Sequence, residues 1–409
     1  MFVMTRISSA LHSDTVRSMD QRTSKPSASA SDTPEREFYA RPNWVEVDGS
    51  AMAHNVRALR RLTGPDVKVF AALKGNACGF GVVEAARVVA AAGADALATV
   101  DLGDAVRIRK HGVVLPLLLY GGNLPTAETV RAVLDYDLTP TFHDRTSAQG
   151  FLRLADAPLR AFVEVNVGGE RFGVDPRDAL SFVQWLADFP SLEITGIYAH
   201  MQVPNSDTAE KIVRWQFDRF QSVLGELDAA GIEIPVRMAA SSKTLVLVKG
   251  MYLNAIDPGH LVFGLDPGGV TRVPVDVRSA LAALKSRLIS VRAFTRSEFL
   301  DDAPFPLREG LRFGVIPLGS SDGLKSLHGG KVLVRGRRVD LLGSPSAEHA
   351  RVDLTDVPDA EVGDEVVIIG RQGHEGISLE DVQRHQGGVR ASDITRRIPA
   401  SIPRRYLEV

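Results

Sequence analysis

Short apolar runs alternate with amphipathic stretches along the chain from Trp44 to about residue 278. The runs are continuously apolar, as parallel strands are when both faces of their sheet are buried. Amphipathic stretches such as Val82–Ala92 and Asp207–Ala230 each end before a glycine able to cap a helix. The predicted strands are Val67–Leu73, Ala94–Val100, Leu115–Tyr120, Leu138–Phe142, Arg160–Val167, Ile194–His200, Pro235–Ala240 and a last one near Val262. This rhythm predicts an α/β fold.

About eight such units over roughly 230 residues fit a closed (β/α)8 barrel. A doubly wound open sheet is the alternative, but no Gly-x-Gly-x-x-Gly fingerprint follows the first strand. Beyond residue 278 the helical pattern nearly stops, which predicts a C-terminal, mostly-β domain. Its predicted strands are Arg287–Phe294, Leu311–Pro317, Lys331–Val334, Val339–Leu342, Ala350–Leu354 and Glu365–Gly370.

We therefore expect three parts in the chain. Residues 1–40 are rich in Ser, Thr, Arg and Asp and are expected to be a disordered extension. Residues 41–278 form the predicted barrel, and residues 279–409 form the predicted β-rich domain.

Charge and cysteine content exclude several classes of function. A formal net charge of -2 leaves no basic surplus for nucleic-acid binding or for an anionic membrane surface. No run approaches the ~18 apolar residues of a membrane-spanning helix. The single cysteine, Cys78, excludes an internal disulfide and a cysteine-built zinc site, and we expect a reducing cytoplasm. No metal-binding motif is found, so we expect no metal.

Catalytic groups of a (β/α)8 barrel lie at the carboxyl ends of its strands. Lys74 directly follows the first predicted barrel strand. A lysine in such a place can lose its proton through desolvation and become a Schiff-base nucleophile. The alternative is a structural lysine whose ammonium group reaches solvent at the barrel rim.

A set of motifs distributed over roughly residues 43–400 bears on this choice. They are Phe70–Gly81, Asn166–Gly173, Gly196–Met201, Ala239–Ser241, Pro258–Gly259, Leu318–Gly323 and Ile369–Gly373. Their order and spacing resemble those of the alanine racemase family, which belongs to the fold-type III pyridoxal-phosphate enzymes. The resemblance implies a barrel followed by a β-domain, pyridoxal 5′-phosphate as cofactor and an amino-acid substrate. It also implies a head-to-tail homodimer in which the second domain of one subunit completes the active site of the other.

The resemblance assigns roles to individual residues. Lys74 would hold the cofactor as a Schiff base, and the His200 imidazole would lie against the cofactor ring. Arg171 would donate to the phenolic oxygen of the cofactor, a task that suits its planar fork. The family often orients this arginine with a modified, negatively charged lysine, and Glu164 supplies the negative charge at that position.

Other residues would hold the cofactor phosphate. Ser241 and the backbone amides of Gly259 and His260 are implied, since a short loop that opens a helix presents free N–H groups to an anion. Without the resemblance, Ser241 and Gly259 are equally well explained as turn residues. Cys78 and Arg396 stand where the family has phosphate-binding tyrosines, and Arg396 is expected to bind the phosphate itself.

The chain departs from the family inside the pocket. Ser320 takes the place of the tyrosine that serves as the second acid/base, and a serine hydroxyl is far less acidic than a phenol, whose pKa is about 10. Asp257 takes the place of the arginine that faces the pyridine nitrogen, and an aspartate would keep this nitrogen protonated and the ring strongly electron-withdrawing. The segment Gly343–Glu348, where the family places a partner-subunit contact to the substrate, is also rewritten.

Three hypotheses about function follow. The first is an amino-acid racemase with Lys74 as one base and Ser320 with water, Glu348 or His349 as the other. The second is a pyridoxal-phosphate lyase or decarboxylase that uses Lys74 on one face only, as Asp257 and the missing tyrosine favour. The third is a non-catalytic, cofactor-binding homologue. The resemblance does not identify the substrate.

Overall fold

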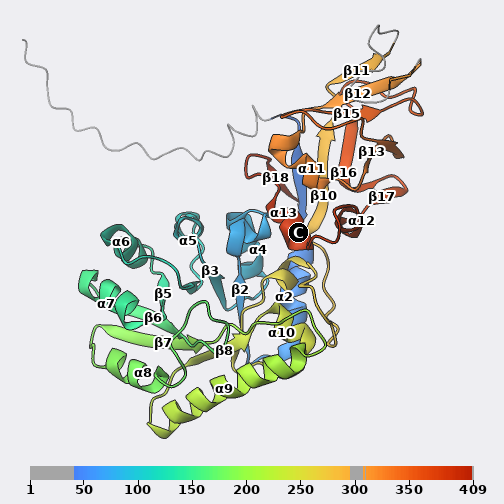
Figure 1. The fold of residues 1–409 in the computed structure, drawn as a ribbon. Helices are drawn as coiled ribbons and strands as arrows, with labels where there is room; N and C mark the ends of the chain where they lie inside the picture. The colour runs from blue at the N-terminus through green and yellow to red at the C-terminus, as the bar shows by residue number, and fades with distance from the viewer. Residues whose placement is uncertain (1–40, 295–306, 309, 408–409) are drawn as a thin grey trace, which may run out of the picture. The chain divides into compact units, whose positions relative to one another are not determined.

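The computed structural model describes residues 41–294, 307–308 and 310–407 (Figure 1). The prediction for residues 1–40 falls outside this range. Within it, eight parallel strands close into a barrel, each pairing with the next and the last with the first. The barrel strands are β2 (Lys68–Ala72), β3 (Ala96–Thr99), β4 (Leu117–Leu119), β5 (Thr139–Phe142), β6 (Leu159–Glu164), β7 (Leu192–Tyr198), β8 (Val236–Ala240) and β9 (Ala255–Ile256). The predicted (β/α)8 barrel is confirmed.

The last barrel strand differs from the prediction. It is β9, whereas Val262 lies in the 3-10 helix η1 (His260–Phe263). The apolar run around Val262 is buried beneath α2 (Gly49–Thr63), whose Asn55 side chain donates to the carbonyl of Val262. Packing under a helix therefore produced the apolar pattern that resembled a strand.

Helices follow most of the barrel strands. They are α3 (Lys74–Cys78), α4 (Val82–Ala91), α5 (Leu102–Lys110), α6 (Ala127–Asp135), α7 (Arg145–Leu154), α8 (Ala179–Ala187), α9 (Ala209–Ala229) and α10 (Ser242–Leu247). Side chains cap several of them at the amino end, and Asp101, Thr126 and Asp144 each accept a backbone N–H of the first turn. None of the helices in the described residues combines the length and apolarity needed to cross a membrane.

Side chains fill the interior of the barrel. Its buried cluster consists of Phe70, Ala72, Ala96, Ala98, Leu118, Tyr120, Phe162, Tyr198, Val236, Met238 and Ala255. Phe162 packs edge-on against Phe70, with 5.9 Å between ring centroids. Gly196 lets this ring fit, because a Cβ there would lie 2.2 Å from the Phe162 ring. The barrel is thus a packed core with its free space at the mouth.

The second domain is mostly β, as predicted, and is built on a mixed sheet of order β14-β13-β16-β10-β1-β18, with β17 beside β16. A smaller sheet has the order β11-β12-β15. The strands are β1 (Trp44–Asp48), β10 (Leu281–Arg287), β11 (Ser290–Ala293), β12 (Arg312–Ile316), β13 (Lys331–Val334), β14 (Arg337–Asp340), β15 (Ala350–Asp353), β16 (Glu365–Gln372), β17 (Glu375–Ile377) and β18 (Arg404–Leu407). Short helices complete it: η3 (Ser320–Asp322), α11 (Leu324–Leu327), α12 (Leu379–His385) and α13 (Ala391–Arg396).

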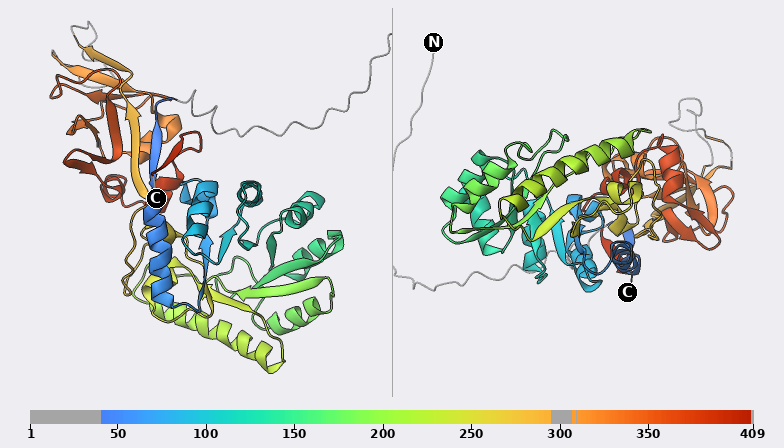
Figure 2. Two further views of the ribbon diagram at one scale, coloured as in Figure 1. Left: turned by 180° about the vertical axis from the view of Figure 1, so that it is seen from behind. Right: turned by 90° about the horizontal axis from the view of Figure 1, so that it is seen from below.

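Strand β1 comes from the segment expected to begin the barrel. It pairs antiparallel with β10 and parallel with β18, so it lies in the sheet of the second domain (Figure 2). The two ends of the described chain therefore meet in this sheet. The boundaries 41–278 and 279–409 stay predictions, with Trp44–Asp48 structurally part of the later sheet.

The loop that carries Lys74 is fastened to the C-terminal segment. Arg404 donates through Nε to the carbonyl of Gly79 at 2.9 Å, and the Tyr406 hydroxyl donates to that of Phe80 at 3.1 Å. Gly79 has a φ of 91°, and a Cβ there would lie 2.2 Å from the carbonyl oxygen of Thr395 in α13. The second domain thus helps to fix the first strand-end loop of the barrel.

We predict that Gly79→Ala destabilises the protein by about 3 kcal/mol or more, because it adds a backbone clash to the strain of a positive φ. The measurement is the midpoint of urea-induced unfolding. Gly93→Ala is the matched control, since Gly93 has a φ of 96° but nothing within 4 Å of the added carbon. It should cost only about 1 kcal/mol. Equal losses would show that the contact with α13 is unimportant.

Candidate active site

The predicted site residues follow the carboxyl ends of different barrel strands. Lys74 comes after β2, and Glu164 is the last residue of β6. His200 lies just past β7, Ser241 directly after β8 and Asp257 directly after β9. Since neighbouring strands of the barrel are parallel, these residues all lie at one end of it.

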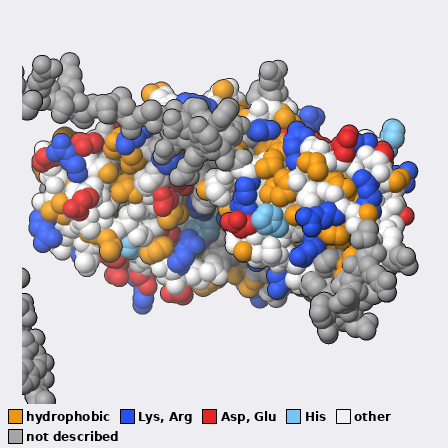
Figure 3. All heavy atoms as spheres, turned by 90° about the horizontal axis from the view of Figure 1, so that it is seen from above, with side chains coloured by type: hydrophobic (Ala, Val, Ile, Leu, Met, Phe, Trp, Pro, Cys, Tyr) orange, Lys and Arg blue, Asp and Glu red, His pale blue; other side chains and the backbone are white. Residues whose placement is uncertain are grey.

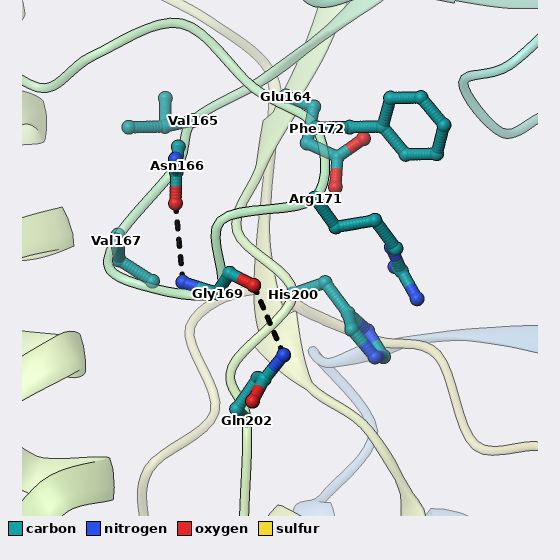
Figure 4. A pocket seen from close by; sticks show the side chains of 9 residues that line it. All are labelled: Glu164, Val165, Asn166, Val167, Gly169, Arg171, Phe172, His200 and Gln202. Atoms are coloured by element: carbon teal, nitrogen blue, oxygen red, sulfur yellow. Dashed lines mark hydrogen bonds between the residues drawn. The ribbon is translucent and has the colours of Figure 1, made fainter.

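A cavity of about 200 Å³ opens at this end. It is lined by Lys74, Val100, Tyr120, Gly121, Glu164, Arg171, Phe172, Tyr198 and His200. A smaller neighbouring hollow shares Glu164, Arg171, Phe172 and His200 with it, and Figure 4 shows the Arg171 and His200 side chains extending to the same side. In the space-filling view of Figure 3, both basic and acidic side chains border a hollow in the middle of the face shown. The structure thus brings three residues of the prediction, Lys74, Arg171 and His200, into one cavity.

The backbone after Lys74 forms a left-handed turn. Asn76, Ala77 and Cys78 have φ values of 51°, 55° and 53°, a conformation that costs a non-glycine residue ~1–2 kcal/mol. Hydrogen bonds hold the turn: the Ala77 amide donates to the carbonyl of Leu73 at 2.9 Å, and the Asn76 side chain accepts the amide of Val82 at 2.9 Å. The turn fixes the direction in which the chain leaves Lys74, and strain of this kind is common at functional sites.

Two tyrosine–carboxylate pairs lie deeper in the mouth. The Tyr120 hydroxyl donates to Oδ2 of Asp257, and the Tyr198 hydroxyl donates to Oε2 of Glu164, each at 2.9 Å. The two rings are 5.7 Å apart in an edge-to-face arrangement, and Nζ of Lys74 lies 4.8 Å from the centre of the Tyr120 ring. Sequence reasoning gave neither tyrosine a role. The sequence did contain a signal for them, because each tyrosine lies near the carboxyl end of a predicted barrel strand.

Burial raises the pKa of both carboxyl groups. Desolvation is the main cause for Asp257 and Glu164, opposed by the positive charge of Lys74 and by the hydrogen bond from each tyrosine. Desolvation and the adjacent carboxylates also raise the pKa of Tyr120 and Tyr198 well above that of a free phenol. Both hydroxyls therefore stay protonated and act as donors.

Two histidines of the prediction are neutral near pH 7. Burial, together with the charges of Lys74 and Arg171, lowers the pKa of His200 to about 3. Burial and the charge of Arg396 lower the pKa of His260 to about 4. A neutral imidazole can lie flat against an aromatic ring without placing another charge beside Lys74.

The resemblance implies that Glu164 orients Arg171, but the two side chains form no direct ion pair in the described residues. Glu164 instead accepts a hydrogen bond from Tyr198. Arg171 is exposed, and its guanidinium lies 5.8 Å from the centre of the Phe172 ring. Its orientation by Glu164 stays a prediction.

The residues expected to bind phosphate lie around the start of α10 and η1. Ser241 occupies the N-cap position of α10, but its side chain makes no capping hydrogen bond. The Gly259 amide donates to the hydroxyl of Ser242 at 3.0 Å, and so does the Leu261 amide at 3.2 Å. The sequence analysis assigned no role to Ser242. Binding of phosphate by the Gly259 amide would require this bond to be exchanged and stays a prediction.

Arg396 reaches the lysine loop from α13. Its Cδ lies 3.0 Å from the place that a Cβ at Gly75 would occupy. The charge of Arg396 lowers the pKa of His260, as burial does. It also lowers the pKa of Cys78, but there the larger effect of burial raises the pKa. Arg396 also pairs with Asp393 at 2.6 Å. Arg396 thus lies beside the loop that carries Lys74, and a guanidinium next to an amine is a donor set that fits a phosphorylated aldehyde.

Ser320, the residue expected to act as the second acid/base, does not line the cavity of its own chain. It begins η3 in the second domain, is exposed, and donates through Oγ to the carbonyl of Ser346 at 3.1 Å. Glu348 and His349 are also exposed, and they follow Ser346 closely in the chain. The Ser346 amide donates to the carbonyl of His349. None of these three lines the cavity of Lys74 in this chain. The described residues contain no group of three or more His, Cys, Asp or Glu side chains arranged to hold a metal.

Comparison with known proteins places this geometry in a family. Residues 47–267 match the model of the alanine racemase N-terminal domain, and residues 281–406 match that of the C-terminal domain. The alanine racemase of Desulfosudis oleivorans is 32% identical over 383 residues, covering 89% of this chain and 96% of the relative. That of Methanococcus maripaludis is 28% identical over 375 residues, covering 90% and 99%.

Solved structures agree. The alanine racemase of Bacillus anthracis with bound L-Ala-P has 26% identity and a TM-score of 0.80, covering 90% of this chain and 96% of that one. The alanine racemase of E. faecalis has 26% identity and a TM-score of 0.79, covering 90% and 98%. The chain belongs to the alanine racemase family, whose named relatives are isomerases.

The lowered histidine pKa values predict a loss of stability in mild acid. The unfolded chain binds protons on His200 and His260 below a pKa of about 6.5, whereas the folded chain does not until about pH 3–4. Each imidazole therefore lowers the free energy of unfolding by up to ~1.4 kcal/mol per pH unit as the pH falls from about 6.5 to 4. Urea unfolding at pH 7 and pH 5 measures this slope.

His200→Gln should flatten the slope, and His374→Gln, at an exposed turn, should leave it unchanged. Asp257 and Glu164, whose raised pKa values act in the opposite direction, are present in every variant and cancel in the comparison. An identical slope in His200→Gln and the wild type would contradict the neutral, buried state of His200.

Proposed function

We propose that this protein binds pyridoxal 5′-phosphate on Lys74 and racemises an amino acid at its α-carbon. The observation that supports this most is the meeting of Lys74, Arg171 and His200 in one cavity at the barrel mouth. Membership of the alanine racemase family gives the reaction type. Alanine or a related amino acid is the proposed substrate class.

The chain's own residues fit the cofactor. Arg396 and Ser241 would hold its phosphate, and Arg171 would donate to its phenolic oxygen. The neutral His200 ring would lie against the cofactor ring, and Asp257 would accept from the ring nitrogen. When bound, the cofactor supplies an electron-withdrawing ring that makes the α-hydrogen of an attached amino acid acidic. Lys74 would take up that proton on one face.

Racemisation requires a second acid on the opposite face, and the cavity of this chain does not contain Ser320. We propose a head-to-tail homodimer in which the partner's second domain covers the barrel mouth. The exposed surface around Ser320, Glu348 and His349 is then the source of the second proton donor. A cytoplasmic location, expected from the lone cysteine, belongs to the same proposal.

A lyase or decarboxylase is the second candidate. Asp257 favours it, because this carboxylate is buried, accepts a hydrogen bond from Tyr120 and lies beside the charge of Lys74. An ionised partner at the ring nitrogen makes the cofactor a stronger electron acceptor, which suits bond cleavages that produce a long-lived carbanion. Such an enzyme needs no proton donor on the second face.

Isotope exchange separates the candidates. The protein with added cofactor is incubated in deuterium oxide with L- and D-amino acids, and products are analysed by chiral chromatography and mass spectrometry. We expect deuterium at the α-carbon of both enantiomers, and no exchange with Lys74→Ala. Ammonia, carbon dioxide or an aldehyde would support the lyase, and absence of any reaction would support a non-catalytic homologue.

Restoring the missing phenol tests the dimer. Ser320→Tyr should raise the rate of racemisation on the order of tenfold to a hundredfold, the low end of the gain from a positioned acid or base. Ser321→Tyr, at the exposed neighbouring position, is the matched control and should have no effect. No gain from Ser320→Tyr in a protein shown to be dimeric by light scattering would contradict the placement of Ser320 at the partner's cavity.

A further inference from the structure

Tyr120 spans the mouth of the barrel. It follows β4, whereas its hydrogen-bond partner Asp257 follows β9, and β2 and β3 lie between these strands in the barrel order. The side chain therefore reaches across the lumen. Space for it exists because Ala72, Ala98 and Ala255 present small side chains to the same interior cluster.

The hydrogen bond acts on one oxygen of a buried carboxylate. Tyr120 donates to Oδ2 of Asp257 at 2.9 Å, and a carboxylate has lone pairs on both oxygens. The ionisable groups that act on Asp257 or share its surroundings are Lys74, whose charge favours the ionised carboxylate, and Glu164, whose own ionisation Asp257 opposes. A phenol donor favours the ionised form as well.

This inference rests on the proposed function. We infer that Tyr120 is a positioning residue, which keeps Asp257 ionised and oriented so that the proton shared between Asp257 and the ring nitrogen of the cofactor lies on the nitrogen. Asp257 and a pyridine nitrogen can share one proton in two ways, as carboxylate with protonated nitrogen or as carboxylic acid with free nitrogen. Tyr120 stabilises the first of these.

The neighbouring tyrosine provides an internal comparison. Tyr198 is buried in the same cluster, its ring packs edge-on against that of Tyr120, and its hydroxyl donates over the same 2.9 Å. Its acceptor is Glu164 rather than Asp257. If Tyr120 were only a filler of the barrel interior, the two tyrosines would be equivalent with respect to the cofactor nitrogen.

The test uses the full-length protein loaded with pyridoxal 5′-phosphate labelled with ¹⁵N in its ring. The ¹⁵N chemical shift reports whether the ring nitrogen carries the proton, and retained cofactor absorbance reports binding. We expect the wild type and Tyr198→Phe to show a protonated nitrogen. Tyr120→Phe should shift the resonance toward the unprotonated value with the cofactor still bound.

An unchanged shift in Tyr120→Phe would overturn the inference and leave the proposed function intact. A wild-type protein that binds cofactor with an unprotonated nitrogen would also overturn it. Failure of the wild type to retain cofactor would instead remove the proposed function, and the inference with it. If Tyr120→Phe does not fold, 4-aminophenylalanine placed only at position 120 keeps the ring and provides a weaker donor, and it should move the resonance toward the unprotonated value. No movement would contradict the inference.

Discussion

Closure of the barrel by the parallel pairing of β9 with β2 is the constraint on which the site depends. Lys74 and Asp257 follow these two strands and are 183 residues apart in the sequence (257 − 74). The pairing places both residues at the same end of the barrel, as the proposed contact between Asp257 and a cofactor on Lys74 requires. A second constraint acts on the loop itself, because Arg404 and Tyr406 hold the carbonyls of Gly79 and Phe80.

Removing carboxylates from water at the barrel mouth has a free-energy cost, and their hydrogen bonds and nearby positive charge offset part of it. A buried, ionised carboxylate is destabilised by several kcal/mol unless it has partners. Asp257 and Glu164 each receive a phenol hydrogen bond, and the charge of Lys74 favours both in the ionised form. The histidines respond in the opposite direction and lose their protons. At the barrel mouth the buried carboxyl groups are thus paired with phenol donors, and the buried imidazoles are uncharged near pH 7.

The features that could be predicted from the sequence are those that depend on the order and periodicity of the strands. The barrel, the mostly-β second domain and the place of Lys74 followed from apolar periodicity and from the rule that barrel sites lie at the carboxyl ends of strands. Tyr120 was not predictable in this way, because its partner is 137 residues distant and the contact crosses the barrel interior. Ser242 was missed because the local turn decides which of two adjacent serines meets the Gly259 amide. The pairing of β1 with β10 and β18 was missed because strand partners far apart in sequence leave no local signal.

Covalent attachment of the cofactor is the central claim and can be measured directly. The protein is incubated with pyridoxal 5′-phosphate, reduced with borohydride and digested, and the peptides are analysed by tandem mass spectrometry. The account predicts that the reduced cofactor is found on Lys74, in near-stoichiometric amount and before any other lysine reacts. Modification spread over exposed lysines such as Lys68, with Lys74 unmodified, would contradict it.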